Sequence, residues 1–382
     1  MEEIEENNII KLSKSCIGKA EKTAVMRVLD EEYLGMGSEV ELFELQLTNF
    51  FDRSVVCVAS GTAALQLALE AAGIGSGDEV LVQSITYVAS FQAISATGAK
   101  PIACDIDPTT LCLDWKDAEK RLTSKTKAVM TVHYAGGAGE LDKIYAFAKK
   151  HGLRVIEDAA HAFGSEYHNK KVGSFGDISC FSFDGIKNIT SGEGGCIVTD
   201  DEEVLSRVRD ARLLGVIGDT QKRYKSDRSW EYNVESQGWR YHMSNIMAAI
   251  GIEQLKKFQK LSDKRKELAN RYLINLSGID SIKTILDDLD NVTPHIFPIL
   301  ISEEIDRVVL RNKLSNINIQ TGIHYFPNHL LTFYEQTSKA RLPVSESIYK
   351  RILSLPLHPD LAVSDVDFIS LKLSDFIGKE HV

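Results

Sequence analysis

The chain has 382 residues, 43% of them hydrophobic, which is enough apolar material for a large buried core and, by length, for two or three domains. Its formal net charge is −10, with 44 Lys and Arg against 54 Asp and Glu, so we expect no nucleic-acid-binding surface. Residues 1–6 are acidic and no apolar run is long enough to cross a bilayer, so we expect no signal peptide, no membrane contact and a cytoplasmic location.

Strand-like and helix-like segments alternate between residues 55 and 157. The expected strands are 55–59, 80–83, 101–105, 128–133 and 155–157, and the expected helices are 63–72, 88–97, 115–122 and 141–150. This alternation is typical of an α/β protein with a mostly parallel sheet and helices on both faces.

Two long helical runs follow, at 245–259 and 261–276, and the rest of the chain mixes strands and helices. We predict a large domain over residues 1–255 and a smaller α+β domain over residues 256–382. The boundary is expected to run through a helix, because no low-complexity linker separates the two parts.

The six cysteines are scattered and lack the spacing of a metal site, so we expect reduced thiols and no metal. They are Cys16, Cys57, Cys104, Cys112, Cys180 and Cys196.

A tight turn, Ser60-Gly61-Thr62, joins the first strand to its helix. A phosphate at that helix start would meet free backbone amides, the Thr62 hydroxyl and the helix dipole, a favourable interaction of about 0.3–1 kcal/mol. Ser and Thr also cap many helices that bind nothing, so the motif alone is weak. A dinucleotide site is excluded, because the glycine-rich segment 73–77 follows the helix and does not fit G-x-G-x-x-G.

Asp158 directly follows an apolar strand-like run and is expected at the carboxyl edge of the sheet, where open α/β sheets bind ligands. A carboxylate there can keep a pyridine nitrogen protonated, which makes pyridoxal 5′-phosphate (PLP) an electron sink. The alternative is a helix N-cap, since small residues follow Asp158.

Lys187 lies on a polar turn between two strand-like runs, 178–183 and 196–199, and a glycine-rich segment at 192–195 follows it. A lysine held there can be desolvated, which lowers its pKa and makes a neutral amine available to form a Schiff base. On this segment alone, a solvated loop lysine is the simpler reading.

These segments, in this order, resemble the DegT/StrS family of PLP-dependent nucleotide-sugar aminotransferases, and the match runs from about residue 34 to 377. The resemblance rests on Gly37-Ser38-Glu39-Val40, Ala59-Ser60-Gly61-Thr62-Ala63, Gly77-Asp78-Glu79-Val80, Glu157-Asp158-Ala159-Ala160-His161, Lys187-Asn188-Ile189, Gly192-Glu193-Gly194-Gly195 and Gly322-Ile323-His324-Tyr325. It implies a fold-type I aminotransferase, with a mostly parallel mixed sheet in the large domain.

The resemblance also implies roles around the cofactor ring. Lys187 would form the Schiff base and then move the proton, and Asp158 would pair with the pyridine nitrogen. His161 would lie near the ring and its phenolic oxygen, and Tyr87 would stack on the ring. Without the resemblance, Tyr87 would be read as an ordinary half-buried tyrosine.

Gly61, Thr62 and Ser182 would bind the cofactor phosphate. The family commonly has an Asn, reaching from the partner subunit to the phosphate, where this chain has Arg240, and an Arg where it has His242. The planar guanidinium of Arg240 suits phosphate oxygens. Arg240 could equally bind substrate or be a surface arginine.

The resemblance implies transfer of an amino group from glutamate to a nucleoside-diphosphate keto-6-deoxyhexose, 4-keto in preference to 3-keto. The product would be a deoxyamino sugar for surface polysaccharide or O-antigen. His324 and Asn188 would contact the substrate, although His324 could instead be a structural turn histidine. The expected assembly is a homodimer with shared active sites, which fits the closely spaced aromatic residues at Trp230, Tyr232, Trp239 and Tyr241.

Three other functions stay open. Related PLP-dependent sugar dehydratases carry a histidine in place of the lysine, so Lys187 counts against that activity. A non-catalytic binding or regulatory relative is disfavoured by the intact pair of Asp158 and Lys187. A fold-type I enzyme that acts on amino acids alone would be distinguished by its failure to react with a keto-sugar nucleotide.

Overall fold

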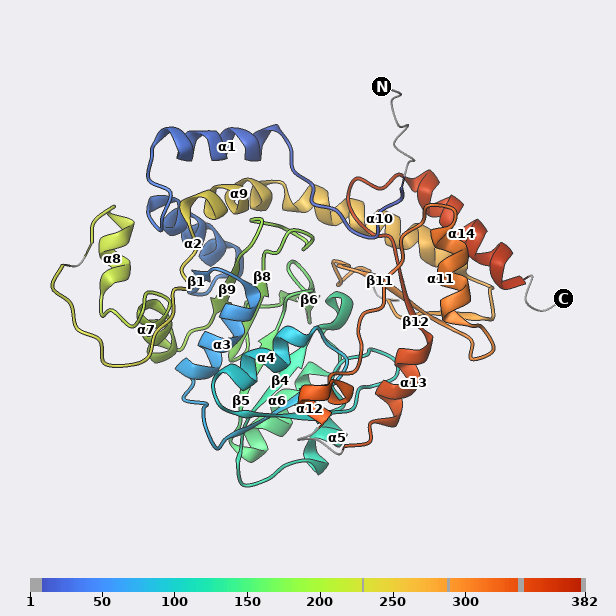
Figure 1. The fold of residues 1–382 in the computed structure, drawn as a ribbon, viewed down its shortest axis with the longest axis horizontal. Coiled ribbons are helices and arrows are strands. Elements are labelled where there is room, and N and C mark those ends of the chain that lie inside the picture. The colour runs from blue at the N-terminus through green and yellow to red at the C-terminus, as the bar shows by residue number, and fades with distance from the viewer. Residues whose placement is uncertain (1–8, 229, 287–288, 336–339, 379–382) are drawn as a thin grey trace.

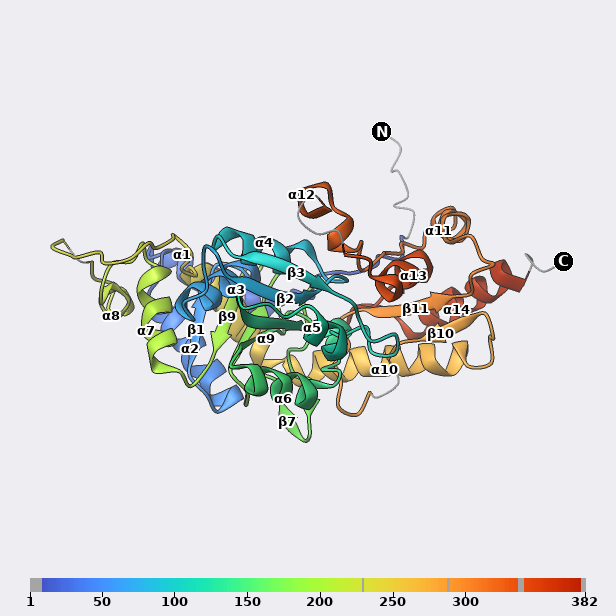
Figure 2. The ribbon, with the colours of Figure 1, turned by 90° about the horizontal axis from the view of Figure 1, so that it is seen from below.

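The computed structural model describes residues 9–228, 230–286, 289–335 and 340–378. A large sheet with its helices and a smaller sheet with its helices lie side by side (Figure 1; Figure 2). The helices are α1 (Lys19–Asp30), α2 (Ser38–Phe51), α3 (Gly61–Ala71), α4 (Val88–Ala96), α5 (Trp115–Lys120), α6 (Leu141–His151), α7 (Glu202–Ala211), α8 (Asp219–Tyr224), α9 (Asn245–Lys256), α10 (Phe258–Leu276), α11 (Arg307–Ser315), α12 (Thr332–Glu335), α13 (Pro343–Arg351) and α14 (Val363–Gly378). The strands are β1 (Val55–Val58), β2 (Glu79–Gln83), β3 (Lys100–Cys104), β4 (Thr126–Val132), β5 (Arg154–Asp158), β6 (Glu166–Tyr167), β7 (Lys170–Lys171), β8 (Ile178–Ser182), β9 (Gly195–Val198), β10 (Ile282–Thr284), β11 (Phe297–Ile301) and β12 (Ile352–Leu355).

The large sheet has the strand order β1-β9-β8-β5-β4-β2-β3. Strands β8, β5, β4, β2 and β3 are parallel, and β9 runs antiparallel to both of its neighbours. The prediction of a mostly parallel, mixed sheet in an α/β fold is therefore confirmed. The carboxyl ends of β5 and β8 lie at the same edge, because parallel neighbours end together.

Alternate residues of each strand bury their side chains in different cores. In β1, Val56 and Val58 pack with α3, α4 and α7, whereas Val55 and Cys57 pack with α2 and α9. On the far side of the sheet, α5 and α6 cover β2, β4 and β5. Both faces are thus buried, which explains why these strands read as nearly continuous apolar runs.

The smaller sheet is antiparallel, in the order β10-β11-β12, and packs with α10, α11, α13 and α14. The predicted boundary near residue 255 coincides with the junction of α9, which ends at Lys256, and α10, which begins at Phe258. Ile10 pairs with Ile319, so the first described residues lie against the C-terminal part of the chain. The division at residue 255 stays a prediction.

Most predicted elements match the observed ones to within one or two residues. The turn predicted at residues 60–62 is shorter than expected, because α3 already begins at Gly61. Ser60 is the N-cap, and its side chain accepts a hydrogen bond from the Ala63 amide at 3.1 Å. This cap satisfies one free amide and fixes the helix start next to the end of β1.

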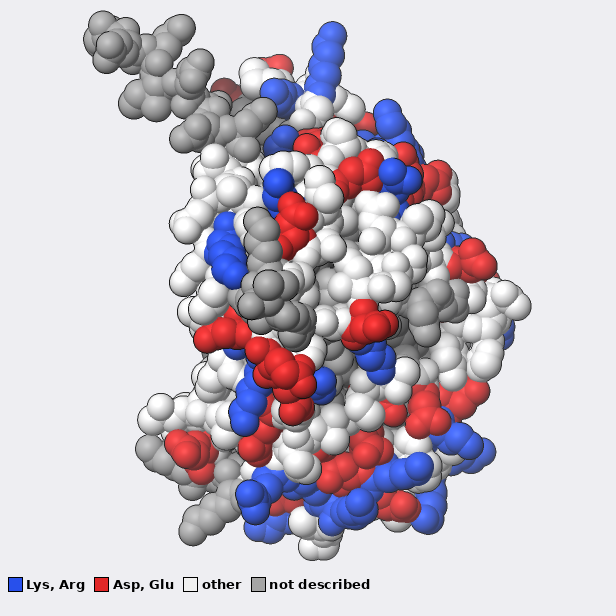
Figure 3. Space-filling view, turned by 90° about the vertical axis from the view of Figure 1, so that its right-hand side faces the viewer, with Lys and Arg blue, Asp and Glu red and all other residues white. Residues whose placement is uncertain are grey.

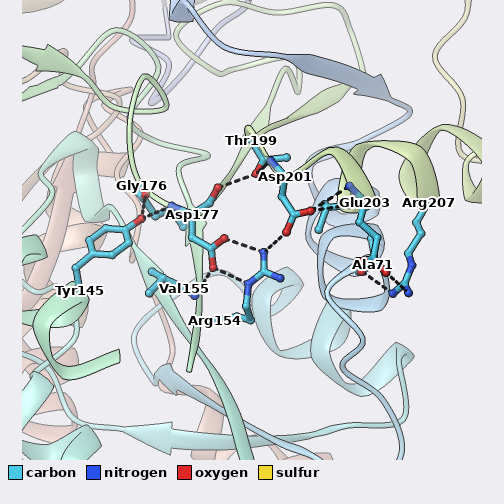
Figure 4. A network of polar contacts seen from close by, with 12 residues as sticks. Ala71, Tyr145, Arg154, Val155, Gly176, Asp177, Thr199, Asp201, Glu203 and Arg207 are labelled. Carbon is cyan, nitrogen blue, oxygen red and sulfur yellow. Dashed lines mark hydrogen bonds and ion pairs between the residues drawn. The ribbon is translucent and has the colours of Figure 1, made fainter. Parts of the chain in front are cut away.

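A network of charged side chains links the amino ends of β5 and β8, at the end of these strands away from Asp158 (Figure 4). Arg154, the first residue of β5, makes two hydrogen bonds of 2.8 Å to Asp177 and a third of 3.1 Å to Asp201. Asp201 is also the N-cap of α7. These paired contacts hold the amino ends of β5 and β8 in register. The site lies at the other ends of these strands, where Asp158 is.

Basic and acidic side chains are interspersed on the face shown in Figure 3. None of the helices in the described part of the chain is both long and apolar enough to span a membrane.

Candidate active site

A cavity of about 500 Å³ opens at the carboxyl edge of the large sheet, between β5, β8 and the start of α3. It is lined by most of the residues selected from the sequence: Gly61, Thr62, Tyr87, Asp158, His161, Ser182, Lys187 and His324. The topology therefore brings into one cavity residues that are far apart in the chain.

The N-terminus of α3 forms one wall of the cavity. An added Cβ at Gly61 would lie 2.8 Å from the Cβ of Ser182, so the backbone and Ser182 approach closely only because position 61 is glycine. Thr62 forms the same wall of the cavity. Backbone amides and two hydroxyls thus converge where the helix dipole is positive, an arrangement that suits an anion.

Asp158 ends β5 and is buried, with only 5% of its surface exposed. Its Oδ2 accepts a hydrogen bond of 2.7 Å from the Ser90 hydroxyl, and its Oδ1 accepts one of 3.2 Å from the Ala160 amide. Burial raises the pKa of Asp158, whereas these two hydrogen bonds and the charge of Lys187 oppose the rise. No helix begins after Asp158, so it is not a helix N-cap.

Lys187 lies on the turn after β8, where its amide donates a hydrogen bond to the Asp184 carbonyl at 3.1 Å. The side chain is half-buried and lines the cavity. Desolvation lowers the pKa of Lys187 to about 8, although Asp158 and Asp184 raise it. At pH 7 about one tenth of the amine is then neutral, far more than for an ordinary lysine.

His161 has a defined tautomer. The Ala135 amide donates to its Nδ1 at 3.3 Å, so Nδ1 is an acceptor and Nε2 carries the proton. Nε2 then donates to the Tyr325 hydroxyl at 3.0 Å, which leaves the Tyr325 proton available for another acceptor. Burial holds the pKa of His161 well below its usual value, so the ring is neutral.

His324 lies beside this pair, and its Nδ1 is 2.7 Å from the Ser354 hydroxyl. Burial lowers the pKa of His324 to about 4, so it presents a neutral ring to the cavity.

Tyr87 immediately precedes α4 at the mouth of the cavity. Tyr87 is 61% exposed, so it is more exposed than the half-buried tyrosine expected without the family resemblance. Its ring centroid lies 5.8 Å from that of Tyr325.

Two predicted residues lie apart from the described cavity wall. The amide of Asn188 is buried and donates to the carbonyls of Phe163 and Thr293, at 3.1 and 3.2 Å. Its side chain therefore braces the backbone after Lys187, and its predicted contact with the substrate stays a prediction. Arg240 is exposed and lies in a separate hollow with Arg223, so it does not reach this cavity within one chain.

Sequence reasoning missed three residues that contribute to the site. Ser90 bonds to Asp158, Tyr325 bonds to His161, and His295 lies 3.4 Å from the Lys187 amine. Tyr325 stands in a motif that carried the resemblance, but Ser90 and His295 stand in no recognisable motif. No cluster of potential metal ligands is found among the residues that the structure describes.

Comparisons with known proteins agree with this geometry. Residues 15–374 match the DegT/DnrJ/EryC1/StrS aminotransferase family. The spore coat polysaccharide biosynthesis protein SpsC of Bacillus subtilis is 37% identical over 380 residues, covering 97% of this chain and 98% of SpsC.

Two solved structures have the same fold. PseC of Helicobacter pylori, an aminotransferase involved in the biosynthesis of pseudoaminic acid, has a TM-score of 0.90 and is 30% identical, with 97% of this chain and all of PseC covered (100%). The PLP form of Spr1654 from Streptococcus pneumoniae has a TM-score of 0.90 and is 28% identical, with 97% and 99% coverage.

The residues present fit PLP. The amides and hydroxyls at the start of α3 suit its phosphate, the buried carboxylate of Asp158 suits a protonated ring nitrogen, and the amine of Lys187 suits its aldehyde. The resemblance seen in the sequence is thereby confirmed: the chain belongs to the DegT/DnrJ/EryC1/StrS aminotransferase family and is a fold-type I aminotransferase with pyridoxal 5′-phosphate as its cofactor.

Proposed function

We propose that the protein transfers an amino group from glutamate to a nucleoside-diphosphate 4-keto-6-deoxyhexose, and so makes a deoxyamino sugar for a surface polysaccharide. The observation that carries this proposal is the convergence of Asp158, Lys187 and the start of α3 on one cavity. The choice of a sugar substrate is supported by SpsC, named for polysaccharide biosynthesis, and by PseC, named for pseudoaminic acid biosynthesis.

When bound, PLP supplies an electron sink for negative charge that develops on the carbon bearing the amino group. Asp158 is proposed to hold the ring nitrogen protonated, and Ser90 fixes the orientation of that carboxylate. Lys187 is proposed to carry the proton between the reacting carbon atoms with its neutral amine. A single positioned base of this kind typically contributes about 10²- to 10⁴-fold in rate.

The other residues have binding roles in this proposal. Gly61, Thr62 and Ser182 hold the phosphate, and Tyr87 covers the ring from the cavity mouth. The neutral ring of His324 can form a hydrogen bond with a sugar hydroxyl, or donate one to a diphosphate oxygen.

We propose a homodimer as the working assembly. Large apolar side chains on α1 and α2 are exposed in the single chain, at Met26, Leu29, Leu42 and Leu45, and they favour burial against a second copy. Arg240, which is exposed in the single chain, is proposed to reach the cofactor phosphate of the partner subunit. A cytoplasmic location fits the six cysteines, all of which are free thiols.

A half-reaction assay tests the function. The protein is first loaded with pyridoxamine 5′-phosphate and then mixed, one at a time, with 4-keto and 3-keto nucleoside-diphosphate sugars. We expect the absorbance of PLP to appear with a 4-keto sugar. If only amino-acid-derived keto acids restore that absorbance, the sugar assignment is wrong.

A further inference from the structure

His295 lies two residues before β11 and is almost fully buried, with 4% of its surface exposed. Its amide donates to the Ala135 carbonyl at 3.2 Å, and its carbonyl accepts a hydrogen bond of 3.0 Å from Arg265. The same guanidinium donates to the carbonyl of Ile186, the residue before Lys187, at 3.4 Å. One buried arginine thus holds the backbone of both His295 and the lysine turn.

The side chain of His295 faces the lysine. Its Nε2 is 3.4 Å from the Lys187 Nζ, and its ring centroid is 4.5 Å from that of His161. Its Nδ1 has no hydrogen-bond partner within the described residues. A histidine that accepts at Nε2 carries its proton on Nδ1, so this geometry fits a neutral ring that receives a hydrogen bond from the lysine.

The surroundings keep the ring neutral. Burial is the main reason why the pKa of His295 lies well below its usual value. The nearby basic side chains lower this pKa further; they are Lys187, His161, Arg265 and His324. A neutral imidazole does not compete with the lysine for a proton near neutral pH. It therefore differs from Asp158 and Asp184, the carboxylates that favour the charged form of Lys187.

We propose that His295 is a positioning residue that accepts a hydrogen bond from the Lys187 amine whenever that amine is not bonded to the cofactor. The contact holds Nζ against the cavity wall. The Lys187 side chain then keeps one rotamer, in which the lone pair of Nζ points toward the reacting atoms. The inference rests on the proposed role of Lys187, and it adds a specific acceptor for the released side chain.

The test measures cofactor capture by the full chain freed of PLP. The variant His295→Phe keeps a ring beside His161 and removes the acceptor, whereas His295→Gln keeps an acceptor without a titrating ring. Two quantities are followed: the affinity for pyridoxamine 5′-phosphate, which cannot bond to Lys187, and the rate of covalent PLP capture, trapped with borohydride and mapped to Lys187. His358→Gln, at another buried histidine, is the matched control.

We expect capture by His295→Phe to slow by about tenfold, the order expected when a reacting group loses one hydrogen bond, while pyridoxamine phosphate affinity stays within about twofold. His295→Gln should regain most of the rate, and His358→Gln should match the wild type. If His295→Phe does not fold, as judged by circular dichroism, His295→Leu replaces it.

Two results would overturn the inference. One is an unchanged capture rate in the variant without an acceptor. The other is an equal loss of capture and of pyridoxamine phosphate affinity in the Phe and Gln variants, which would show a purely structural histidine. A wild-type protein that captures no PLP on Lys187 would instead refute the proposed function itself.

Discussion

The hydroxyl of Ser90 donates a hydrogen bond of 2.7 Å to Oδ2 of Asp158, from the first turn of α4 to the end of β5. Thr86 Oγ1 lies 3.0 Å from the same hydroxyl, so Thr86, Ser90 and Asp158 form one chain of polar contacts. This arrangement orients Asp158 and favours its ionised form, against the effect of burial.

We expect Ser90→Ala to weaken PLP binding and transamination by about 10- to 100-fold, because a hydrogen bond to a charged group is worth about 1.5–3 kcal/mol. Loss of the donor should also raise the pKa of Asp158, so the acid limb of the pH profile should shift to higher pH. Ser95→Ala, on the same helix but bonded to Tyr334, is the control. Equal activity of the two variants would mean that Ser90 is not needed to hold the carboxylate.

Asp158→Asn removes the buried charge and leaves the shape of the side chain. We expect covalent attachment of PLP to persist and transamination to fall by at least about 100-fold, since breaking a buried charge pair costs about 3–5 kcal/mol. Single-turnover absorbance measurements would separate the two effects. Turnover close to that of the wild type would exclude Asp158 as the partner of the ring nitrogen.

Lys187→Ala should still bind the cofactor through the start of α3 but should lose turnover. In the wild type, borohydride reduction and peptide mapping should place the cofactor label on Lys187. The loss should be at least about 10²- to 10⁴-fold, the usual contribution of a positioned base. A label on another lysine would refute the assignment.

The pH dependence of PLP capture should report the lowered pKa of Lys187. Only the neutral amine attacks the aldehyde, so below pH 8 the capture rate should rise by about tenfold per pH unit. It should level off above about 8, whereas the rate with an ordinary lysine would continue to rise up to that group's usual pKa of 10.5. A rate that still climbs at pH 9.5 would show that burial does not perturb this amine.

The core of the large domain was predictable from the sequence because strands buried on both faces appear as short apolar runs, as at β1 and β5. The residue that follows such a strand lies at the carboxyl edge of the sheet, so Asp158 could be placed there from the pattern, whereas Lys187 was joined to it by the family resemblance. The start of α3 was placed slightly late, because the capping role of Ser60 depends on its backbone geometry.

The rest of the site depends on contacts between distant segments. Ser90 is 68 residues from Asp158, and His295 is 108 residues from Lys187, so neither contact has a local signature. Asn188 also depends on a distant segment. The resemblance implied substrate contact for it, whereas in the structure its amide donates to the Thr293 carbonyl.

Arg240 provides the sharpest test of the proposed assembly. If it grips the cofactor phosphate of the partner, Arg240→Asn should be tolerated, because the family commonly has Asn there. Arg240→Ala should weaken PLP retention by about tenfold or more, since a charge-assisted hydrogen bond is worth about 1.5–3 kcal/mol. Keto-sugar KM should change little once PLP is saturating. Normal PLP retention with a raised sugar KM would instead place Arg240 on the substrate.

Mixed dimers then show which chain supplies the contact. In a dimer of one Arg240→Ala subunit and one Lys187→Ala subunit, a contact made across the interface puts both defects in one site and leaves the other intact. Differently tagged subunits, purified as the heterodimer, should then recover about half of the wild-type activity, as two-fold symmetry requires. At a PLP concentration too low to load the Arg240→Ala homodimer, a contact made within one chain leaves each site with one defect and gives no such recovery. Light scattering on the same samples checks the dimer, and an active monomer at assay concentration would refute the shared site.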